Sequence, residues 1–133
     1  MTIRARLRNG QGRNEIELAT DGSPRSLSIG AKRDGRGSEI NGGELFLLAL
    51  ATCYCNDVYR EAAKHGIEIE DVDVVVEGEF SRPGAPGNNI VYRPRVSSPA
   101  SADEIRALLM HVDTVAEIHN TVRAGTEIRI DLP

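Results

Sequence analysis

The chain has 133 residues, enough for one domain with a buried core. Apolar residues make up 40% of it and charged residues 27%, which is ordinary for a globular protein. Its net charge of −4 argues against a general binder of nucleic acid or anionic membrane, because both are polyanions. The chain opens without an apolar signal region, and its longest apolar run, residues 45–55, is too short to span a bilayer. We therefore expect a cytoplasmic protein.

Three strands are predicted before residue 30. Residues 3–8 alternate between apolar side chains and arginines, and residues 15–18 alternate between glutamates and apolar side chains. The turn signal at residues 9–12 joins the two segments, so the arginine face can lie across from the glutamate face in a hairpin. A second turn at residues 21–24 leads to a short strand expected near residues 26–29.

Residues 30–43 are rich in glycine and predict a mobile, solvated loop. Lys32, Arg33 and Arg36 give this segment positive charge. A phosphate-binding loop is the alternative. However, neither GxxxxGK[ST] nor GxGxxG spacing follows a strand here, so the solvated loop is the better interpretation.

One long helix is predicted over residues 43–65. Asn41 is placed to cap its start and Gly66 to end it. The first half, ELFLLALATCYC, is apolar on nearly every face, and such a helix must be surrounded by other elements. A single small domain offers little cover for it, so a second subunit is expected.

The rest of the chain predicts two strands, a helix and a final strand. The strands lie around residues 72–77 and 90–96, and Ser101 with Glu104 forms a capping box at the start of a helix. A further short apolar stripe ends at Gly125, and residues 128–132 alternate as a last strand. The order βββαββαβ lacks regular βα alternation, so residues 1–133 are expected to form a single α+β domain.

Two cysteines, Cys53 and Cys55, lie on the predicted helix. Their spacing is neither a zinc pattern nor a CxxC redox motif. Residues two apart on a helix point roughly 200° away from each other, so the two sulfurs are expected to stay unbridged. For either cysteine alone, the plain interpretation is a small buried hydrophobe.

No cofactor or metal is expected. His111 and His119 could be imagined as metal ligands together with Asp113 or Glu117, but they lack the tight HxxxH or HExxH spacing of known sites. Surface or capping roles are the better interpretation for these histidines.

Two segments carry a resemblance to a known family. The first is NGGELFLLALATCYCNDVYREAAKHGIEIEDVDVVVEGEF, and the second is AEIHNTVRAGTEIRI. The first resembles the signature of the OsmC/Ohr family, in which a glutamate opens a leucine- and alanine-rich helix that bears a cysteine. Cys53 matches the family cysteine, and Asp57 also fits one branch of the family. The likeness covers almost the whole chain.

The resemblance implies an OsmC-like fold with a long central helix packed in an intertwined homodimer. Its sites would lie at the dimer interface. The well-studied branches reduce organic hydroperoxides or hydrogen peroxide with two cysteines. Cys53 is therefore the candidate peroxidatic thiol, and the expected small-molecule partners are a peroxide and a thiol. A thiolate is the nucleophile in such chemistry, and the sulfenic acid it becomes must meet another thiol.

The sequence departs from the family pattern in two places. The second family cysteine falls at Ala116, and the acid expected ten residues before Cys53 falls at Gly43. Glu44 matches the neighbouring family position instead, and the resemblance makes it the candidate for the acid that holds an arginine against the thiolate of Cys53. The arginine that the family holds against the thiolate would come from the N-terminal loop. Arg13 is the candidate for this role, with Arg8 as an alternative.

His119 is the remaining candidate site residue, because it occupies the position of a family serine and would approach Cys53 as an imidazole partner. Two functions follow from these residues. In the first, Cys53 reduces peroxides and an external thiol restores it. In the second, the dimer has lost that chemistry and binds a small ligand in its interfacial pocket.

Overall fold

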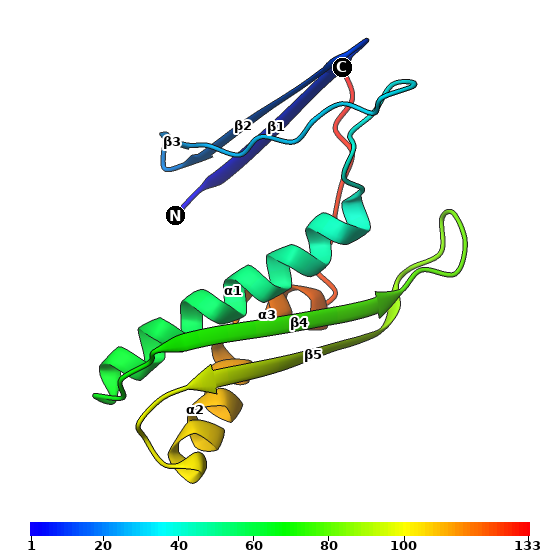
Figure 1. The fold of residues 1–133 in the computed structure, drawn as a ribbon. Helices are drawn as coiled ribbons and strands as arrows, with labels where there is room; N and C mark the ends of the chain where they lie inside the picture. The colour runs from blue at the N-terminus through cyan, green and yellow to red at the C-terminus, as the bar shows by residue number, and fades with distance from the viewer. The chain divides into compact units, whose positions relative to one another are not determined.

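The computed structural model describes residues 1–133, which form an α+β fold as the sequence predicts (Figure 1). The elements in chain order are β1 (Ile3–Gly10), β2 (Arg13–Thr20), β3 (Ser23–Arg25), α1 (Gly42–Lys64), β4 (Asp71–Glu79), β5 (Asn88–Ser97), α2 (Ala102–Val115) and α3 (Glu117–Arg123). Two compact units, Met1–Leu45 and Phe46–Pro133, divide the chain, and each is described by itself. The expectation of a single domain therefore stays a prediction.

The first unit is built on an antiparallel sheet of β1, β2 and β3 in that order. Arg6 lies opposite Glu17 and Arg8 opposite Glu15, so the arginine face meets the glutamate face as predicted. The Arg6 guanidinium lies 3.2 Å from the Glu17 carboxylate. The third strand begins at Ser23, earlier than expected, because a tight turn with positive φ at Asp21 and Gly22 returns the chain to β2 at once.

The glycine-rich loop is fastened to this hairpin by two asparagines. The Asn14 amide donates to the Ile29 carbonyl, and the Asn9 side chain accepts from the Gly37 backbone N–H. A single β-bridge between Ala31 and Ser38 closes the loop on itself. These contacts fix the path of the chain before it enters α1.

The caps predicted for α1 are confirmed. The Asn41 side chain accepts from the Glu44 backbone N–H at 2.9 Å, and its amide donates to the Glu44 carboxylate at 2.7 Å. At the other end, Gly66 adopts a φ of 65°, a left-handed conformation that glycine takes without steric cost. The backbone N–H of Ile67 then donates to the Ala62 carbonyl.

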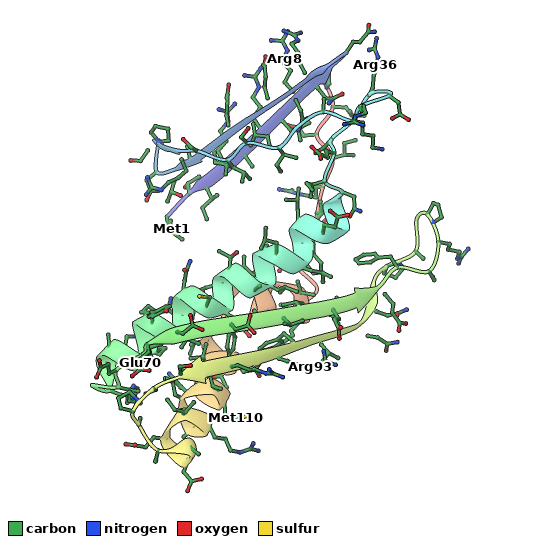
Figure 2. The ribbon with its side chains drawn as sticks, in the orientation of Figure 1. Met1, Arg8, Arg36, Glu70, Arg93 and Met110 are labelled. Atoms are coloured by element: carbon green, nitrogen blue, oxygen red, sulfur yellow. The ribbon has the colours of Figure 1, made fainter.

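The second unit packs helices against an antiparallel β4–β5 pair, with α1 running alongside these strands (Figure 1). Its core consists of buried side chains from α1 and α2: Tyr54, Val58, Ala62, Leu108 and Val112. Inward-facing residues of the strands, such as Val72, Val74 and Tyr92, pack on this cluster. On the outer face, Arg93 of β5, labelled in Figure 2, forms an ion pair with Glu77 of β4.

The predicted capping box opens α2, since the Ser101 hydroxyl accepts from the Glu104 backbone N–H and the Glu104 carboxylate accepts from the Ser101 backbone N–H. The helix stops at Ala116, and α3 begins directly at Glu117. The predicted last strand, residues 128–132, forms no strand within this chain, because no other strand pairs with it.

No helix in the structure combines the length and the apolar character that crossing a membrane requires.

Candidate functional site

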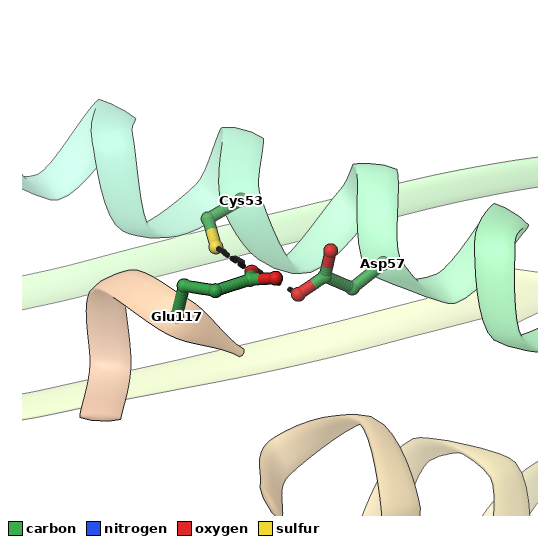
Figure 3. A group of neighbouring side chains, drawn as sticks. All are labelled: Cys53, Asp57 and Glu117. Carbon is green, nitrogen blue, oxygen red and sulfur yellow. Dashed lines mark hydrogen bonds between the residues drawn. The ribbon is translucent and has the colours of Figure 1, made fainter. Parts of the chain in front are cut away.

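The site is built around the thiol of Cys53, which lies on α1 and is partly exposed. Its Sγ atom lies 3.8 Å from Oδ2 of Asp57 and 3.7 Å from Oε2 of Glu117, and each of these oxygens can accept a hydrogen bond from the thiol (Figure 3). Cys53 and Asp57 share one face of α1 because they are four residues apart. Glu117 reaches the thiol from α3.

The break between α2 and α3 brings Glu117 to this position. Ala116 adopts an extended conformation and is fully buried, while its backbone N–H donates to the Val112 carbonyl at 3.1 Å. The chain therefore turns sharply after a buried anchor, and the first residue of α3 faces α1.

Arg60 holds the acidic groups together. Its Nη1 atom lies 2.7 Å from Oδ1 of Asp57 and 3.5 Å from Oε1 of Glu117, and its Nε atom lies 3.2 Å from Oε2 of Glu61. Asp57 is only 3% exposed. A buried carboxylate is costly without a cation and hydrogen bonds, and Arg60 provides both.

The electrostatics of the site favour the protonated thiol. Burial raises the pKa of Cys53, and the negative charges of Asp57 and Glu117 raise it further, although a hydrogen bond from the backbone of Ile118 acts in the opposite direction. A protonated thiol is a poorer nucleophile than a thiolate, so this cysteine needs a group that takes its proton as it reacts.

The pKa values of Asp57 and Glu117 are shifted in opposite directions. Burial and then the charge of Glu117 raise the pKa of Asp57, while hydrogen bonding to its own backbone and the charge of Arg60 lower the pKa of Glu117. Asp57 therefore holds a proton more readily than Glu117 does. Such a pair offers one proton donor and one proton acceptor next to the sulfur.

The same three side chains are the group that could hold a metal ion. One ligand atom from each of Cys53, Asp57 and Glu117 lies within 4.8 Å of the others. However, the guanidinium of Arg60 already binds both carboxylates and supplies the positive charge that a cation would bring. The donor set thus fits a resident metal poorly.

Glu44 and Arg13 belong to the first unit, and their predicted roles toward Cys53 stay predictions. Glu44 serves the N-terminal cap of α1, the same helix that carries Cys53. The Arg13 guanidinium lies 3.8 Å from the carboxylate of Glu15, its neighbour on β2.

His119 is buried, with only 5% of its side chain exposed, so the surface role predicted for it is wrong. Its ring packs against Tyr54 and Tyr92, at centroid distances of 5.9 and 4.8 Å. Neither ring nitrogen has a hydrogen-bond partner, and the thiol of Cys53 donates to carboxylates rather than to the imidazole. Burial lowers the pKa of His119, which favours the neutral ring.

Cys55 faces away from this site. It lines a separate hollow with Val72 and Val74 of β4, and both cysteines are free. The two thiols therefore have different neighbours, in agreement with the unbridged cysteines predicted from the helical geometry.

Sequence reasoning missed Arg60 altogether and considered Glu117 only as a metal ligand beside the histidines. Arg60 carried a usable signal, because Cys53, Asp57 and Arg60 recur at i, i+4 and i+7 and must share one face of the helix. Glu117 carried none, since its position depends on the break after Ala116.

Comparison with known proteins places this site in a wider context. A family model described as OsmC-like protein matches residues 35–131. The protein YmaD of Bacillus subtilis (strain 168) is 26% identical over 127 residues, which cover 90% of this chain and 85% of that protein.

Two solved structures share the fold. The OsmC-like protein of Mycoplasma pneumoniae is similar with a TM-score of 0.65 and 20% identity, covering 96% of this chain and 93% of its own. The organic hydroperoxide resistance protein OsmC of Legionella pneumophila is similar with a TM-score of 0.64 and 22% identity, covering 92% and 90%. At these identities the structures establish the fold, and the family model establishes membership: the chain belongs to the OsmC-like protein family.

Proposed function

We propose that this chain is an OsmC-like thiol protein in which Cys53 reduces an organic hydroperoxide or hydrogen peroxide. The thiol attacks a peroxide oxygen, the O–O bond breaks, and the products are a cysteine sulfenic acid and an alcohol or water. An external small thiol then condenses with the sulfenic acid and releases water. A second external thiol reduces the mixed disulfide and restores Cys53.

One observation carries this proposal: a partly exposed thiol at the family position has two carboxylates within hydrogen-bond reach. The thiol proton therefore has an acceptor at the moment of attack, which compensates for the raised pKa of Cys53. The similarity to a hydroperoxide resistance protein supports the same chemistry.

The need for an external thiol follows from the side chains near Cys53. The position of the second family cysteine is Ala116, which is buried and has no sulfur. Cys55 lies on another face of α1 beside β4. Neither residue supplies a resolving thiol within the chain.

The proposal includes a homodimer. Apolar side chains of α1 remain open within a single chain, with Leu48 58% exposed and Tyr59 45% exposed. Burying such groups against a second copy would remove apolar surface from water. Sedimentation velocity at low micromolar concentration tests this proposal, and a stable folded monomer would contradict it.

A second candidate is a dimer that binds a small ligand without peroxide chemistry. A cavity of about 160 Å³ in the second unit favours it. Its lining is mostly apolar, with His119, Tyr92 and Arg123 as polar groups. The raised pKa of Cys53 also favours this candidate, because the resting thiol is not strongly activated.

Peroxide consumption in the presence of excess dithiothreitol separates the two candidates. The wild type should consume an organic hydroperoxide at a rate well above that of dithiothreitol alone. Cys53→Ser should abolish this activity, and Cys55→Ser, the matched control, should retain most of it. Equal rates for the wild type and Cys53→Ser would favour the binding function.

A further inference from the structure

We propose that Asp57 and Glu117 divide the two proton transfers of the Cys53 reaction. Glu117 takes the proton of the thiol, and Asp57 gives a proton to the oxygen that leaves. This inference rests on the proposed function and assigns catalytic roles to two residues beyond Cys53.

The geometry allows both roles. The two carboxyl groups approach the same sulfur at 3.7 and 3.8 Å, from different elements, α3 and α1 (Figure 3). An oxygen bonding to that sulfur would therefore arrive beside both groups. Glu117 is exposed and can exchange protons with water, whereas Asp57 is buried within the second unit.

Burial and neighbouring charges indicate that Asp57, rather than Glu117, is the proton donor. Asp57 is buried, which disfavours its charged form, and the neighbouring charge of Glu117 disfavours it further. A proton bound by this pair is therefore held by Asp57 in preference to Glu117. Arg60 binds an oxygen of each carboxyl group and keeps the other oxygen of each turned toward the sulfur.

Oxidation of Cys53 needs no reactant other than the hydroperoxide. As Sγ attacks the OH-bearing oxygen of the hydroperoxide, the S–H proton passes to Glu117, the S–O bond forms, and the O–O bond breaks. The sulfur is oxidised and the peroxide is reduced. The departing alkoxide takes the proton of Asp57 and leaves as an alcohol. Glu117 is then protonated and Asp57 ionised, and one proton moved between the neighbouring carboxyl groups restores the starting state.

Two reactions of the same thiol separate this role from a structural one. Oxidation by cumene hydroperoxide releases an alkoxide that needs a proton, whereas alkylation by iodoacetamide releases iodide, which needs none. Both rates are measured on the full chain in single turnover as a function of pH. Asp57→Asn should slow oxidation by at least about tenfold and should not slow alkylation, because it removes a negative charge beside the thiol. Asp73→Asn, which changes an exposed aspartate of β4, is the matched control and should change neither rate.

Glu117→Gln provides the second test, because it should move the two reactions in opposite directions. Loss of the charge next to Sγ makes the thiolate easier to form, so alkylation at neutral pH should become faster. Loss of the proton acceptor should make oxidation slower. Asp57→Glu, which keeps an acid, should recover part of the oxidation rate that Asp57→Asn loses.

The outcomes distinguish failure of this inference from failure of the proposed function. If Cys53 of the wild type reacts with the hydroperoxide no faster than free cysteine does, the proposed function itself fails. If the wild type reacts fast and both substitutions change oxidation and alkylation in parallel, the assigned proton roles are wrong and the proposed function stands.

Discussion

Val112 anchors the segment that presents Glu117 to Cys53, and its truncation should destabilise the protein measurably. Val112 is 0% exposed and packs in the core with Tyr54 and Val58. Val112→Ala removes two methyl-sized groups at about 0.8 kcal/mol each, and the cavity left behind raises the cost to roughly 2–3 kcal/mol. For a chain of this size, we expect the melting temperature to fall by roughly 6–12 °C.

Urea denaturation and calorimetry at one fixed protein concentration measure this effect, because association would otherwise shift the apparent stability. The matched control is Val75→Ala on the outer face of β4, where the valine is 47% exposed. That substitution should cost less than about 1 kcal/mol. Equal losses for the two variants would refute the packing described for α1, α2 and the β4–β5 pair.

Three further predictions concern charge and sulfur. Burial and two neighbouring carboxylates raise the pKa of Cys53. The rate of its alkylation by iodoacetamide should therefore be lower than that of free cysteine at neutral pH and should increase as the pH is raised. A rate above that of free cysteine at neutral pH would contradict this. Hydrogen bonds from Lys64 and His111 lower the pKa of Glu61 from 4.5 to about 2, so this group contributes stability above pH 4.5 that is lost as the pH falls toward 2. In the Glu61→Gln variant, the midpoint of unfolding should therefore depend less on pH between 4.5 and 2 than in the wild type. The same pH dependence in both proteins would contradict this role of Glu61. Ala116→Cys restores the second family cysteine and should give a disulfide to Cys53 after peroxide treatment, visible by non-reducing peptide mapping; finding only a sulfenic acid would show that the two positions do not meet.

The features predicted well from the sequence are those that local chemistry decides. The caps at Asn41 and Ser101 depend on side chains only three residues from their partners. The β1–β2 register follows from alternating faces of opposite charge. Family membership was also visible, because the helix that carries Cys53 and the strand after it form a distinctive pattern.

The features that sequence reasoning missed depend on distant contacts. Glu117 faces Cys53 because the chain breaks after Ala116, and no side-chain cap at that residue announces the break. His119 is polar, yet it is buried because two tyrosines, far from it in the sequence, enclose its ring. The last predicted strand needs a neighbouring strand, and a pattern of alternation cannot supply one.

The central claim is that Cys53 is a peroxide-reducing thiol without a resolving partner in its own chain. Mass spectrometry of the protein after one equivalent of cumene hydroperoxide, with and without a small external thiol, tests it most directly. We predict a sulfenic acid on Cys53 without the thiol, a mixed disulfide at Cys53 when the thiol is present, and an unmodified Cys55. A peroxide that persists while Cys53 remains a free thiol would contradict the claim.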